Sequence, residues 1–156
     1  MFMLDLVDER SMREVKAIPE GLEVDGEKIT FHAPEQDKET IKRIVSDLLT
    51  RLGFVNIDVE DVAEILEGAE RIVLGEGIAS GENRCALAAR EAVKHFTHAK
   101  KALVEVITGV EITLVEMVDT ADEVAVSCED DTDLIWGHVI DEKMGESVKV
   151  SIIAVV

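Results

Sequence analysis

Residues 40–66 read TIKRIVSDLLTRLGFVNIDVEDVAEIL, and this stretch organises the rest of the chain. In its first half, apolar side chains recur at positions 41, 44, 45, 48, 49 and 52. That spacing places one apolar stripe along an α-helix, which we predict over residues 39–52. Gly53 should end this helix in the left-handed conformation, because glycine adopts it without a steric penalty. Phe54 and Val55 are then expected to fold back onto the core.

The second half of the stretch contains an acidic loop, residues 56–61, with Asn56, Asp58, Glu60 and Asp61. One interpretation is helix capping, with Asp58 or Asp61 as the N-cap of a short helix over residues 62–67. A carboxylate there accepts hydrogen bonds from free amides and meets the positive end of the helix dipole. The other interpretation is a chemical role for the same carboxylates. The local sequence leaves both open.

The other segments predict strands and helices that form a small sheet-based core. An Asp25-Gly26 turn between alternating runs predicts a hairpin, because this dipeptide favours two-residue turns. A capping box from Thr113 to Glu116 opens a helix that runs to about Ser127. Strands are predicted at residues 13–18, 22–24, 28–31, 71–74, 102–108, 134–140 and 148–156. The last of these has apolar residues on both faces, which is typical of a strand buried on both sides.

Three glycines, Gly75, Gly77 and Gly81, precede an alanine-rich helix predicted over residues 81–96. A strand, a glycine-rich turn and a helix can form a nucleotide site. However, the spacing GxGxxxG differs from GxGxxG, and the chain contains no GxxxxGK[ST]. Acidic residues within the segment would also repel a phosphate. We therefore predict a tight turn with Ser80 as the N-cap of the helix.

The chain of 156 residues carries 16 basic and 34 acidic side chains, a formal charge of −18. This charge disfavours nucleic acids and anionic membranes as partners and favours a basic protein face or a cation. Apolar residues make up 47%, which is enough for one domain with a genuine core. Residues 102–142 contain twelve acids and no Lys or Arg, the pattern of a solvated acidic face.

Metal and cofactor sites are not expected. His95 and His98 have no third ligand near them in the sequence and more simply complement the end of a helix dipole. Residues 129–133 lack the spacing and glycine of a calcium loop. Cys85 and Cys128 are too few for a disulfide framework and fit small buried hydrophobes. Residues 1–7 are apolar but too short for a signal peptide, so we expect a cytoplasmic protein.

Four motifs in this order resemble the C-terminal half of the tubulin/FtsZ family. They are NIDVEDV at residues 56–62, GEGIASGENRCALAAREAV at 75–93, TLVEMVDTADEV at 113–124 and LIWGHVIDEKMGESVKVSIIAVV at 134–156. The resemblance implies that the acidic loop reaches a nucleotide held by the next subunit and positions the attacking water. Asn56, Asp58 and Asp61 match the family's loop, and the resemblance implies a role for them in trans. The family's glycine-rich phosphate loop does not occur in this sequence.

We therefore predict a single α+β domain with two layers: a four-stranded mixed or antiparallel sheet with helices on one face. A long helix and an N-terminal hairpin precede it. The predicted division is an N-terminal hairpin extension, residues 1–37, and an FtsZ C-terminal-like domain, residues 38–156, without the GTPase domain. Because the resembling core begins near Thr40, residues 38–156 are expected to fold without the extension.

The resemblance implies a non-catalytic partner of an FtsZ-type protein that docks through the acidic loop. It would cap or tune filaments, or complete GTP hydrolysis in trans. Two alternatives remain open. One is a self-associating structural module without an FtsZ partner, in which the loop only caps a helix. The other is a small-molecule enzyme that has reused the scaffold, although the sequence contains no nucleophile–base pair or cofactor motif.

Overall fold

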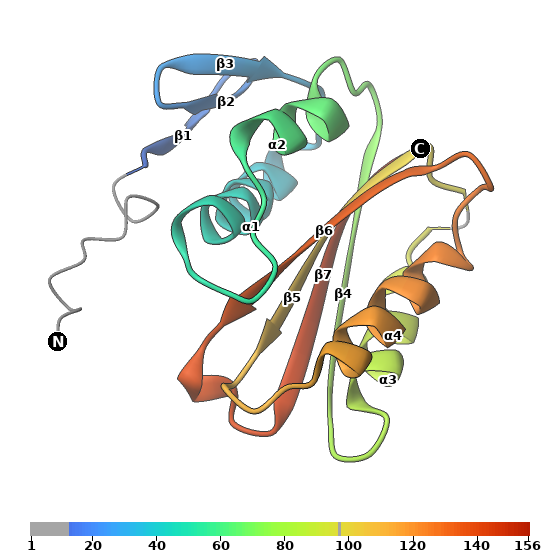
Figure 1. Ribbon diagram of the computed structural model, residues 1–156. Helices are drawn as coiled ribbons and strands as arrows, with labels where there is room; N and C mark the ends of the chain where they lie inside the picture. Colours follow the sequence, from blue (N-terminus) through green and yellow to red (C-terminus); the bar gives the residue numbers. More distant parts are fainter. Residues whose placement is uncertain (1–12, 97) are drawn as a thin grey trace, which may run out of the picture.

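The computed structural model describes residues 13–96 and 98–156, and its centre is a four-stranded sheet (Figure 1). The strands are β4 (Ile72–Ser80), β5 (Lys101–Thr108), β6 (Asp133–Ile140) and β7 (Ser147–Val155), in the order β4-β7-β5-β6. Strand β7 is antiparallel to both β4 and β5, whereas β5 and β6 are parallel. The predicted mixed sheet in an α+β fold is confirmed. The expectation for residues 1–7 lies outside the described residues.

Helices cover both faces of this sheet (Figure 1). The predicted pair, α3 (Arg84–Val93) and α4 (Leu114–Ala125), lies on one face. On the other face, α1 (Lys38–Thr50) and α2 (Val59–Leu66) pack over a second core. The structure thus adds a third layer to the two that the sequence predicted. Strand β7 explains why: Ile152 and Ala154 belong to the core under α3 and α4, and Ile153 belongs to the core under α1 and α2.

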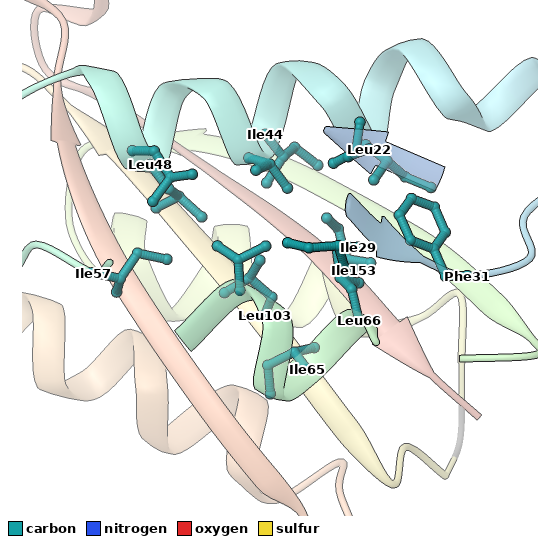
Figure 2. Packing of buried hydrophobic residues seen from close by; sticks show 14 of the residues in the cluster. Leu22, Ile29, Phe31, Ile44, Leu48, Ile57, Ile65, Leu66, Leu103 and Ile153 are labelled. Carbon is teal, nitrogen blue, oxygen red and sulfur yellow. The ribbon is translucent and has the colours of Figure 1, made fainter. Parts of the chain in front are cut away.

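The N-terminal hairpin is present and belongs to a three-stranded antiparallel sheet of β1 (Val15–Ile18), β2 (Gly21–Val24) and β3 (Glu27–Thr30). Asp25 and Gly26 form the turn with positive φ angles of 50° and 89°, as the Asp-Gly pattern predicts. Figure 2 shows Leu22 and Ile29 of this sheet, and Phe31 directly after it, beside buried side chains of α1 and α2. The hairpin thus shares a core with α1 and α2, and the division at residue 37 stays a prediction.

Gly75 and Gly77 lie in a strand and not in a turn, which corrects our prediction, whereas Gly81, with a φ of 83°, lies in the turn before α3. Strand β4 continues to Ser80, and the N-cap of α3 is Asn83, whose φ is 60°. A Cβ at Gly75 would lie 2.0 Å from the Ala92 carbonyl oxygen, and one at Gly77 would lie 2.1 Å from that of Ala88. The glycines therefore allow α3 to approach the strand closely. Two short 3-10 helices, η3 (Glu35–Asp37) and η4 (Glu142–Met144), complete the described elements.

Candidate functional site

The acidic loop begins α2 through a reciprocal capping box. Helix α2 starts at Val59, three residues before the predicted start, and Asp58 is its N-cap. Asp58 Oδ1 accepts a hydrogen bond from the Asp61 amide at 3.0 Å, and Asp61 Oδ2 accepts one from the Asp58 amide at 3.0 Å. The capping interpretation is therefore confirmed for Asp58. Each carboxylate uses one oxygen, and the described residues offer no further hydrogen bond to the second oxygen of either one.

Asn56 closes the start of the acidic loop. Its Oδ1 accepts a hydrogen bond from the Gly53 amide at 3.3 Å, and its Nδ2 donates to the Gly53 carbonyl at 3.2 Å. The next residue, Ile57, is buried in the core under α1 and α2. The side chain of Asn56 thus shapes the loop, while Asp58 is exposed and Asp61 is half-buried at its end. The structure brings all three predicted site residues together.

Residues 52–55, which we call the edge segment, connect α1 to the acidic loop along the outer side of β6. The His138 amide donates to the Val55 carbonyl at 2.7 Å, and the Ile140 amide donates to the Leu52 carbonyl at 2.9 Å. The sheet edge is therefore covered by the chain that leads into the acidic loop. This pairing could not be predicted from the sequence, because the edge segment has no strand periodicity.

The predictions for Gly53 and Phe54 are wrong. Helix α1 ends at Thr50, Arg51 is extended, and Gly53 is not among the glycines with positive φ. A Cβ at Gly53 would lie 1.7 Å from the His138 carbonyl oxygen, so glycine is needed there for close approach to β6. Phe54 does not enter the core. Its side chain is 60% exposed and stacks on the His138 ring, with centroids 5.4 Å apart.

The surroundings of the acidic loop are also acidic. A hollow of about 350 Å³ lies between the start of α2 and the turn of the N-terminal hairpin. Asp25 and Glu27 line it from the hairpin, and Asp58 and Glu60 line it from α2. Arg13 offsets part of this charge, since its guanidinium lies 3.2 Å from Asp25. The fold brings the start of α2 and the turn of the N-terminal hairpin together, and the sequence contains no signal of this proximity.

A larger hollow of about 690 Å³ lies near the start of α3, where Arg84 is its main cation. The guanidinium donates to the Glu116 carboxylate at 2.9 Å and to the carbonyls of Glu146 and Glu111 at 2.7 and 2.6 Å. The pKa of Arg84 is raised, chiefly by the hydrogen bond to the Glu116 carboxylate. Arg84 therefore clamps two loops together, and its donors are already engaged by the protein.

Within residues 13–96 and 98–156, no group of three or more His, Cys, Asp or Glu side chains is placed to hold a metal ion. The glycines of β4 face α3 and do not form a phosphate cradle. None of the helices in the described part of the chain is long and apolar enough to cross a membrane.

Comparison with known proteins agrees with this fold. The model of the FtsZ family, C-terminal domain, matches residues 70–156, more than half of the chain. The chain belongs to the FtsZ family. It is 31% identical over 117 residues to cell division protein FtsZ 2 of Rhizobium meliloti (strain 1021), covering 70% of this chain and 34% of that protein. It is 28% identical over 116 residues to cell division protein FtsZ of Coxiella burnetii (strain RSA 493 / Nine Mile phase I), covering 70% and 30%.

Two solved structures show the same fold. An empty FtsZ dimer from M. jannaschii superimposes with a TM-score of 0.66 at 23% identity, over 79% of this chain and 40% of that one. The GTPγS-bound protofilament of CetZ2 from Haloferax volcanii superimposes with a TM-score of 0.55 at 18% identity, over 75% and 38%. The chain thus spans about a third of the length of the two FtsZ proteins from Rhizobium meliloti and Coxiella burnetii, and its residues 70–156 correspond to the family's C-terminal domain.

Proposed function

We propose that this chain is a partner of an FtsZ-type protein and docks, through its acidic loop, on the face of the partner that holds the nucleotide. The observation that carries the proposal is the loop itself. Asn56, Asp58 and Asp61 lie together, shortly before the matched FtsZ C-terminal domain at residues 70–156, and each carboxylate keeps one oxygen outside the capping box. The matched structures include an FtsZ dimer and a CetZ2 protofilament, which supports assembly of this chain with a subunit of the same family.

The three residues would have different roles in such a complex. Asp61 and Asp58 would orient the water that attacks the γ-phosphate, and Asn56 would hold the loop in shape. In phosphoryl transfer, most of the stabilisation comes from groups and metal ions that contact the phosphates. Those groups would belong to the partner. This chain would supply half of a site and would not be an enzyme by itself, acting in the cytoplasm where its partner assembles.

The charge of the chain supports a basic docking partner. Asp25 and Glu27 extend the acidic surface beside the loop, and the formal charge of the whole chain is −18. Complementary charge mainly raises the association rate and suppresses wrong partners. We therefore expect docking to weaken as salt increases.

Self-association without an FtsZ partner is the second candidate. The capping box favours it, because stabilising α2 is a sufficient reason for both acids to be there. In that case the loop carries no chemistry, and removing the charge of Asp61 leaves assembly unchanged.

The deciding experiment measures GTP turnover and sedimentation of an FtsZ protein with added wild-type chain, Asp58→Asn or Asp61→Asn. Asparagine still caps a helix but cannot polarise water with a negative charge. The control variant is Asp119→Asn, which removes one exposed charge from α4 on the opposite face of the sheet. We expect the wild type and the control to change the GTP turnover or the sedimentation of FtsZ, and Asp61→Asn to lose this effect. Identical curves for all four proteins would refute the half-site.

A further inference from the structure

His138 on β6 makes a pair of hydrogen bonds that define its protonation state. The side chain is buried, with 1% of the residue exposed. Its Nδ1 lies 2.9 Å from the Phe54 amide, which can only donate, so Nδ1 is the acceptor and carries no proton. The proton is then on Nε2, which lies 2.8 Å from the Thr108 hydroxyl oxygen. That hydroxyl donates to the Gly109 carbonyl at 2.7 Å, which leaves its oxygen free to accept.

His138 contacts the edge segment through its amide, its carbonyl and its ring. Its amide bonds the Val55 carbonyl, its carbonyl faces Gly53 at a distance that excludes a side chain, and its ring is covered by Phe54. The edge segment runs directly into the acidic loop, and Gly53 in turn bonds both ends of the Asn56 amide. The position of the acidic loop therefore depends on His138, through the backbone of Gly53 and Phe54 in the edge segment.

We propose that His138 is the positioning residue of the acidic loop and that its neutral, Nε2-protonated ring is the form that holds the loop in place. A proton on Nδ1 would set two donors against each other at the Phe54 amide and break the bond. His138 thus makes the acidic loop sensitive to acid. The consequence for docking rests on the proposed function, whereas the anchoring itself does not.

The groups around His138 keep the ring neutral at physiological pH. Burial lowers the pKa of His138 and is the sole cause of the shift. Strand β5 contributes only the uncharged Thr108 beside the ring. The charged groups on this edge are Arg51 and Asp141, which pair with each other at 3.7 Å. Helix α4 also packs against β6, and the side chains that it buries, Met117, Thr120 and Val124, do not titrate.

The test is amide hydrogen exchange of Phe54 across a pH series that spans the His138 titration, followed in the same samples by NMR. The variants are His138→Asn, whose Oδ1 can take the place of Nδ1 but cannot titrate, and His138→Gln, whose longer side chain reaches toward the Nε2 position instead. The control amide is that of Glu116, which donates to the Thr113 hydroxyl at 3.1 Å in another cap. Its protection reports whether the fold is intact.

We expect the protection factor of the wild-type Phe54 amide to fall roughly tenfold when His138 is protonated, the effect of losing one hydrogen bond. His138→Asn should keep the protection at every pH, and His138→Gln should lack it at every pH. Unchanged wild-type protection through the titration would overturn the proposal, and so would equal loss in both variants. If a variant exposes the Glu116 amide, the wild-type pH series alone decides.

Docking is measured separately, with FtsZ turnover at neutral pH. His138→Gln should lose the effect as Asp61→Asn does, and His138→Asn should keep it. If the wild type does not act on FtsZ, the proposed function fails while the exchange data still decide the anchor. If the wild type acts and His138→Gln acts equally, the positioning role is refuted.

Discussion

Replacing Glu105 with Gln should stabilise the protein at neutral and alkaline pH. The Glu105 side chain on β5 is fully buried beneath α1. Neither of its oxygens has a hydrogen-bond partner among the described residues, and neither does the hydroxyl of Ser151, which is its register neighbour on β7. The nearest cation is Arg43, whose Nη1 lies 3.6 Å away. That guanidinium also lies 3.5 Å from Asp47 and 3.4 Å from Glu76, so its charge is shared.

The surroundings keep Glu105 protonated. Burial raises the pKa of Glu105 to about 9, and the negative charge of nearby Asp47 adds to the shift. Arg43 and Lys149 lower the pKa by smaller amounts. In the unfolded chain the same group has its ordinary pKa of 4.5.

These pKa values set the sign and size of the effect. Between pH 4.5 and about 9 the folded state holds a proton that the unfolded state has lost, so the free energy of unfolding falls as pH rises. Within this window one group contributes about 1.4 kcal/mol per pH unit. From pH 6 to pH 8 the loss from Glu105 alone is then about 2.7 kcal/mol. Glu105→Gln has nearly the same shape, does not titrate, and escapes this loss.

The assay is urea unfolding of the wild type and Glu105→Gln at pH 6, 7 and 8. We expect the unfolding free energy of Glu105→Gln, relative to that of the wild type, to increase with each upward step in pH. The control is Glu76→Gln, because Glu76 lies in the same register row but is part-exposed and 3.0 Å from Lys149. A difference between wild type and Glu105→Gln that is constant with pH would refute the reasoning, since Glu105 would then ionise as an ordinary carboxyl.

Three further changes test the fold. Asp58→Ala should lower the free energy of unfolding by about 0.5–2 kcal/mol and Asp58→Asn by less, because Asn also caps; equal losses in a denaturant titration would contradict the cap. Gly53→Ala should push the edge segment off β6, so the amides of His138 and Ile140 should exchange faster, and unchanged exchange would show that the contact yields elsewhere. The sequence led us to expect that residues 38–156 fold alone, but the hairpin fills the core shared with α1 and α2, so we now expect removal of residues 1–37 to lower the midpoint of the thermal transition strongly or to abolish the transition. An unchanged midpoint would support the independent domain of residues 38–156.

The predictions from sequence were accurate where the signal is local. The stripe of α1 from Ile41 to Leu49, the Asp25-Gly26 turn and the Thr113 capping box depend on residues a few positions apart, and all three are confirmed. Leu52, the last residue of the predicted stripe, lies beyond the helix and is exposed. Glycine was the main source of error. Gly53 and Gly75 look like turn residues, but a distant carbonyl approaches each of them, and sequence contains no sign of that contact.

The candidate site divides in the same way. The cap at Asp58 follows from the loop itself. The position of Phe54 depends on His138, a residue that lies 84 positions later and that a single sequence does not pair with it. Glu105 sits in an otherwise apolar strand, and only the packing of α1 over that strand shows that it is buried. The resemblance identified the loop, and the structure shows what holds it.

The edge segment also decides which side of the sheet is open to other chains. A bare edge strand presents unpaired amides and carbonyls, and these can pair with a strand from another molecule. On β6, residues 52–55 occupy the amides of His138 and Ile140, so new strands cannot add there while the segment stays in place. Any movement that frees the segment also uncovers this edge. The protein can therefore not gain mobility in the acidic loop without a higher risk of aggregation, and its large negative charge, which keeps copies of the chain apart, reduces that risk.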